Sequence, residues 1–150
     1  MSTREPQNIK QIFEEKYARY LNIQQTIKAY QIIYETQRRQ LEEIITTKEA
    51  LKKIKTRKIR EFEGFASLGS GVFIFLRGEM GSRVLVNIGA NINLYMDIES
   101  AILELERREE KIKKDSNTTA RTLQELIDAA EKLEKELIAL QRYIESQRPS

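Results

Sequence analysis

Three pairs of adjacent carboxylates are the residues whose types could support acid–base chemistry. They are Glu14-Glu15, Glu42-Glu43 and Glu109-Glu110. All three lie in segments with a helical pattern, where adjacent side chains do not face each other and cannot act on one substrate atom. The chain contains no Cys and no His, so thiol chemistry, His-ligated metal and His-based proton transfer are excluded. We interpret the pairs as solubility charges and predict no catalytic residue.

A short glycine-rich segment, Gly69-Ser70-Gly71, is the second place where chemistry would be sought. A phosphate-binding loop of this kind needs a Lys and stands between a strand and a helix, and this segment has neither feature. The glycines, with Gly89, are therefore interpreted as turn or bulge positions. The sequence predicts no enzyme, no cofactor and no metal.

A basic run precedes the centre of the chain and contains a single acid, Glu49. Helical spacing spreads these charges around a helix, so a solvated face is the simplest interpretation. Docking to an acidic partner or to a nucleic-acid backbone stays open, although a net charge of +3 is too small to favour nucleic acid by itself. The run consists of Lys48, Lys52, Lys53, Lys55, Arg57, Lys58 and Arg60.

The composition is that of long helices rather than of an ordinary globule. Charged residues make up 33% of the chain and aromatic residues only 7%, a balance typical of helices rich in Glu, Lys, Leu and Ile. No apolar run approaches the roughly 18 residues that span a bilayer, and the first ten residues lack the apolar core of a signal peptide. We therefore expect a cytoplasmic protein. Because such a chain alone buries little core, we also expect it to oligomerise.

Two helical patterns occupy the first and last thirds, over residues 8–63 and 97–147, and residues 1–7 are expected to fray. In the second pattern, apolar residues recur at alternating spacings of three and four. This repeat presents a narrow seam that only another helix can bury. We predict a long antiparallel two-helix coiled coil, with residue i opposite roughly residue 160 − i. Asp97 is the predicted N-cap of the second helix, and Gly64 is expected where the first one stops.

The central segment, residues 64–96, changes character, because Val, Ile and Phe cluster there with most of the glycines. Residues 72–76 and 84–88 are predicted strands joined by a hairpin turn over residues 77–82. Residues 92–96 form a further predicted strand, and residues 65–68 are a candidate fourth. The predicted fold class is α+β, a single domain over residues 1–150 in which the coiled coil is joined by a small β-hairpin platform.

The order of motifs in this segment resembles that of the prefoldin alpha-subunit family. The motifs that carry the resemblance are Leu68-Gly69-Ser70-Gly71-Val72-Phe73-Ile74, the stretch from Val84 to Ile92, and Asp97-Ile98-Glu99-Ser100-Ala101-Ile102. The helix–strands–helix layout agrees over nearly the whole chain. Two hairpins between the helices, rather than one, would make the chain alpha-type. The resemblance implies a hexamer of two alpha-type and four beta-type subunits, which holds unfolded polypeptides without ATP and delivers them to a group II chaperonin.

The strand residues are apolar on both faces, which an exposed two-stranded ribbon would not tolerate. A private core would explain this, but so short a sheet has little helix cover. We therefore expect packing between subunits. The residues of this predicted oligomer interface are Val72, Phe73, Ile74, Phe75, Leu76, Val84, Val86 and Ile88.

Apolar residues at the free ends of the two helices are the candidate site for unfolded polypeptides. Phe13, Tyr17, Leu140 and Ile144 would also serve to close the coil, whereas Ile9, Ile12 and Tyr143 fit the seam less well. Each contact would contribute only about 1–2 kcal/mol, and several arms acting together would supply avidity. A structural scaffold or tether without this holding activity is the alternative function.

Overall fold

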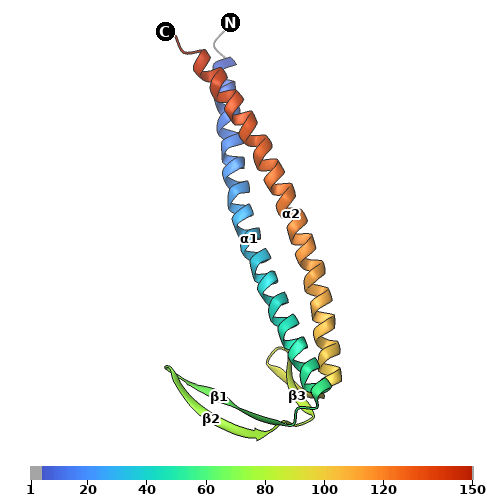
Figure 1. Ribbon diagram of the computed structural model, residues 1–150. Coiled ribbons are helices and arrows are strands. Elements are labelled where there is room, and N and C mark those ends of the chain that lie inside the picture. Colours follow the sequence, from blue (N-terminus) through green and yellow to red (C-terminus); the bar gives the residue numbers. More distant parts are fainter. Residues whose placement is uncertain (1–4, 150) are drawn as a thin grey trace. The chain divides into compact units, whose positions relative to one another are not determined.

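A computed structural model describes residues 5–149, with side chains described from Asn8 onward. Two long helices are joined through two small antiparallel hairpins (Figure 1), which confirms the predicted α+β fold class. The elements in chain order are α1 (Glu5–Arg57), β1 (Glu61–Gly69), β2 (Val72–Glu79), β3 (Arg83–Gly89), β4 (Ile92–Asp97) and α2 (Ile98–Ser146).

The structure divides into two compact units, each of which is described by itself. The arm unit consists of the chain up to Arg38 together with the chain from Lys114 onward. The root unit runs from Arg39 to Lys113 and contains both hairpins. That the whole chain forms one domain stays a prediction.

Helix α1 begins and ends earlier than the sequence predicted. It starts at Glu5, because Pro6 is tolerated in a first turn, where its missing N–H would have no partner. The rest of the segment expected to fray, residues 1–4, lies outside the described residues. The helix ends at Arg57, since Lys58 adopts a left-handed φ of 50° and the Ile59 amide donates to the Ile54 carbonyl. A Lys thus occupies the left-handed position that Gly usually takes, and the prediction of Gly64 as the stop was wrong.

Helix α2 begins where Asp97 predicts. The Ser100 amide donates to Asp97 Oδ1 at 2.7 Å, which is the N-cap geometry. Hydrogen bonds from Ser100 hold the pKa of the Asp97 carboxyl below its usual value. The cap therefore fixes the junction between strand β4 and the helix.

The predicted seam of α2 is buried in both units. In the root unit its buried positions are Ile102, Leu105 and Glu109, and in the arm unit they are Thr119, Ala130, Leu133 and Leu137. The matching buried residue in the described part of α1 is Ile27, which is 7% exposed. Each unit therefore contains a two-helix coil closed along the narrow stripe that the spacing requires.

Ion pairs across the seam show that the two helices of the root unit are antiparallel, because Lys48, Lys52 and Lys55 pair with Glu109, Glu106 and Glu99 in reverse order. Lys52 pairs with Glu106 in the root unit, and Lys16 pairs with Glu136 at 2.5 Å in the arm unit. The predicted register would have placed residues 108 and 144 there instead. The observed pairs depart from the predicted register by two residues at Lys52 and by eight residues at Lys16.

Each hairpin pairs strands that are consecutive in the chain. Strand β1 pairs with β2 and β3 with β4, so the predicted hairpin joining residues 72–76 to 84–88 was wrong. A tight turn of this type needs residues with positive φ. Gly69-Ser70-Gly71 and Gly89-Ala90-Asn91 supply them, with φ between 48° and 105°. Residues 80–82 therefore connect the two hairpins instead of closing one.

A buried carboxylate interrupts the seam of the root unit. Glu109 is 9% exposed and forms an ion pair with Lys48 of the opposite helix. It also accepts a hydrogen bond from Lys113 at 2.6 Å. The hydrogen bonds from Lys113 and Lys48 lower the pKa of Glu109 to about 2. The carboxylate therefore stays charged inside the seam because two ammonium groups compensate it.

Replacing Glu109 by Gln is expected to lower the free energy of unfolding by about 1–3 kcal/mol at pH 7, since the amide cannot compensate two ammonium groups. A folded pKa below the ordinary 4.5 contributes stability above pH 4.5, which is lost as pH falls toward 2. The difference between wild type and E109Q should therefore shrink over that range in denaturant unfolding. Glu110→Gln, at the exposed neighbouring position, is the control. An equal difference at both ends of the range would contradict this role.

Candidate functional site

The β1–β2 hairpin exposes apolar side chains on both faces. Pairing of Phe65 with Phe75 and of Ser67 with Phe73 places three phenyl rings on one face. The rings of Phe65 and Phe75 meet edge to face at 5.5 Å, yet Phe65 is 73% exposed. The other face carries Ile74 and Leu76, which are also exposed. Neither face is covered by the described part of the chain, which is the signature of an interaction surface.

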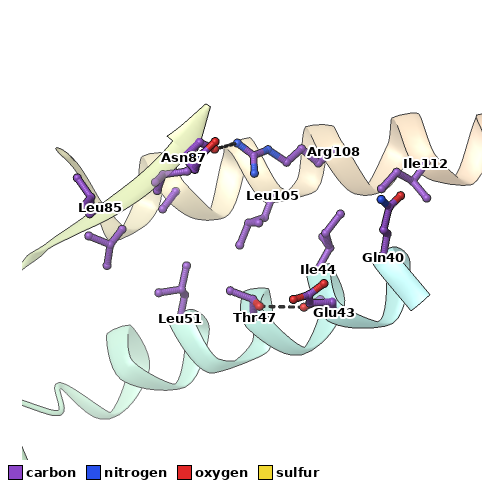
Figure 2. A pocket seen from close by; sticks show the side chains of 13 residues that line it. Gln40, Glu43, Ile44, Thr47, Leu51, Leu85, Asn87, Leu105, Arg108 and Ile112 are labelled. Carbon is purple, nitrogen blue, oxygen red and sulfur yellow. Dashed lines mark hydrogen bonds between the residues drawn. The ribbon is translucent and has the colours of Figure 1, made fainter. Parts of the chain in front are cut away.

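The β3–β4 hairpin differs, because one side of β3 lies against the helices of the root unit. Val84 and Val86 are half-buried and line a cavity of about 550 Å³ together with Leu51 and Leu105. Figure 2 shows Arg108 reaching from α2 to the Asn87 carbonyl, a hydrogen bond of 2.6 Å. The cavity belongs to the contact between this hairpin and its own helices.

The predicted interface residues therefore fall into two groups. Val84 and Val86 face the helices of their own chain, whereas the others are exposed: Val72, Phe73, Ile74, Phe75, Leu76 and Ile88. Their interface role stays a prediction. Sequence reasoning left out further exposed residues of the same strands, although the strand pattern already contained them: Phe65, Leu68, Leu85, Ile92, Leu94 and Tyr95.

The predicted polypeptide-binding residues all lie in the arm unit. Ile9, Phe13, Leu140 and Ile144 are half-buried. Ile12, Tyr17 and Tyr143 are more exposed, at 36%, 48% and 48%. Tyr17 does not close the coil, because it lies outside the seam, where its ring stacks on Phe13 at 6.1 Å. The binding role of these seven residues stays a prediction.

The basic run serves the coil itself at three positions. Lys48, Lys52 and Lys55 pair with the α2 carboxylates of Glu109, Glu106 and Glu99. Lys53, Arg57, Lys58 and Arg60 are exposed. The pairing favours the helix-face interpretation over a nucleic-acid surface.

The described residues show neither a membrane helix nor a metal cluster. Neither α1 nor α2 is both long enough and apolar enough over residues 5–149 to cross a bilayer. Within the same residues, no three Asp or Glu side chains come together as a group that could hold a metal ion. The exposed apolar surfaces are therefore the features that a function must explain.

Comparison with known proteins identifies the fold. The Prefoldin family model, described as prefoldin subunit, matches residues 23–143. The chain belongs to the prefoldin family. A relative named prefoldin subunit alpha, from Archaeoglobus fulgidus, is 28% identical over 129 residues, which cover 80% of this chain and 94% of the relative. This match supports the alpha-type assignment.

A solved filamentous prefoldin from Methanocaldococcus jannaschii has the same fold. It superposes with a TM-score of 0.62 at 20% identity, covering 82% of this chain and 98% of that one. At this identity the match concerns the fold alone. Prefoldin is a chaperone family rather than an enzyme family, and its members assemble with other prefoldin subunits. The exposed hairpin faces agree with membership in such an assembly.

Replacing Phe73 by Asp is expected to weaken assembly with other prefoldin subunits, because the charge must be desolvated in the interface. Asn93 holds the equivalent position of the β3–β4 hairpin, opposite Asn87 as Phe73 is opposite Ser67. Asn93→Asp is therefore the matched control. Native mass measurement should show smaller species for F73D but not for N93D. Circular dichroism should show unchanged helix content for both variants. Assembly of F73D equal to that of N93D would contradict an interface at this face.

Proposed function

We propose that this chain is the alpha-type subunit of a cytoplasmic, ATP-independent prefoldin hexamer of two alpha and four beta subunits. The complex captures non-native polypeptides and passes them to a group II chaperonin. Family membership supports the subunit assignment. The observation that supports the holding activity is the exposure of Ile12, Tyr17 and Tyr143 in the arm unit.

The energetics of these residues suit a holding protein. A half-exposed Ile or Tyr that becomes covered by a client contributes about 1–2 kcal/mol. One such contact releases quickly, whereas contacts from several arms of one complex act together and raise the apparent affinity. Weak single contacts thus allow release to a second chaperone, and their number allows capture.

The triple variant Ile12→Ser, Tyr17→Ser and Tyr143→Ser is expected to assemble normally but to lose most suppression of thermal aggregation of an unrelated protein, followed by light scattering. Deletion of residues 1–17 and 140–150 should act in the same direction. Leu103→Ser removes a 66% exposed apolar side chain from the root unit and is the control. Full protection by the triple variant would refute the tip site, and absence of protection by wild type would favour the tether.

Delivery to a chaperonin is tested separately. A client unfolded in denaturant and held by the assembled complex should regain activity after addition of a group II chaperonin and ATP. Without the chaperonin it should stay bound and inactive. The same recovery with and without the chaperonin would contradict transfer while leaving the holding activity in place.

A further inference from the structure

One part of α1 is nearly free of charge. Between Arg19 and Glu35 the only charged residue is Lys28, whereas charged residues make up 33% of the chain. The stretch contains Ile, Leu and Tyr together with Gln, Asn and Thr. It lies wholly in the arm unit.

The seam accounts for only some of these residues. Ile27 is buried, and Tyr20, Ile23, Tyr30 and Tyr34 are half-buried, as positions facing α2 should be. Three other apolar side chains lie outside the seam: Leu21 is 44% exposed, Ile32 is 65% exposed and Ile33 is 45% exposed.

The exposed residues form a line of their own along the helix. Leu21, Gln25, Lys28 and Ile32 follow one another at spacings of four, three and four, which places them on one face of α1. We call this line the low-charge face. All four of its residues are exposed. It begins one turn after Tyr17, so it continues the exposed surface at the end of the arm.

A solvated helix face is normally rich in charge, and α2 of the same unit follows that rule. Glu131, Lys132, Glu134 and Lys135 are all exposed there. The two helices of the arm unit thus differ in their outer surfaces. Solubility does not explain a 65% exposed Ile32 on a face whose one charged residue is Lys28, whereas binding of an apolar partner does.

We propose that the low-charge face binds uncharged apolar segments of non-native polypeptides, so that the binding surface extends along α1 beyond the arm end. Segments exposed only by unfolding are former core segments, which carry few charges. The low-charge face can cover them while desolvating one charge of its own, that of Lys28. The Gln25 amide can donate to and accept from the unpaired backbone of an extended chain. A coiled-coil partner would instead be selected by complementary charges beside an apolar seam.

This inference rests on the proposed holding activity, and one charge reversal tests it. Ile32→Glu places a charge on the face without touching the seam. Leu103→Glu is the matched control, because Leu103 is 66% exposed and lies among Glu104, Glu106 and Arg107 of the root unit. Binding of a fluorescently labelled, reduced and carboxymethylated model protein to the assembled complex is measured for both. I32E should weaken the apparent affinity about fivefold, and L103E should leave it unchanged.

A photo-crosslinking amino acid at position 32 identifies what covers the face. Crosslinks to the unfolded protein are expected, and crosslinks confined to a second copy of this chain would overturn the proposal. Equal affinity of I32E and wild type would overturn it too. The Ile12, Tyr17 and Tyr143 triple variant separates the two hypotheses. If that variant loses binding while I32E does not, the extended face fails and the tip site stands.

Discussion

The narrow apolar seam is the constraint on which the other features of this protein depend. Apolar residues that repeat every 3.5 positions leave most of a helix in water and bury only a stripe. Residues from Ile102 to Leu137 show this, because the buried positions of α2 follow the repeat. A coil of this kind has almost no interior beyond its seam, so it offers neither an enclosed catalytic pocket nor enough core to cover the strands. The hairpin residues consequently stay exposed in the described part of this chain.

Sequence reasoning predicted the parts of the fold that follow from periodicity and side-chain chemistry. The α2 seam and the Asp97 cap depend on residue types, and both are where the sequence places them. The end of α1 depends on a left-handed Lys58, a conformation that nothing in its side chain requires. The strand pairing was missed for a related reason. Apolar runs show where strands lie, but the positive φ values at Ser70 and Ala90 decide which strands meet.

The candidate surfaces were predictable only in part, because exposure depends on the rotation of each helix. Tyr17 fits an apolar repeat in the sequence, yet it lies outside the seam. Val84 and Val86 fit an interface pattern, yet they line a cavity together with residues of their own helices. The low-charge face, in contrast, was not predicted from the sequence. Its apolar residues are too sparse to attract attention as a motif, and the missing charge between Arg19 and Glu35 is the signal that reveals it.

Glu109 limits how the two helices of the root unit can slip past each other. An entirely apolar repeat would pack almost equally well after a slip of seven residues, since each seam residue would meet another apolar residue. A slip that brings Leu41 to the place of Lys48 would leave a buried carboxylate with only Lys113 of its own helix, whereas the opposite slip would bring Lys55 there. Losing one partner of a buried ion pair is strongly unfavourable, whereas forming the pair adds little net stability. The buried pair therefore acts mainly by making the slip toward Leu41 unstable.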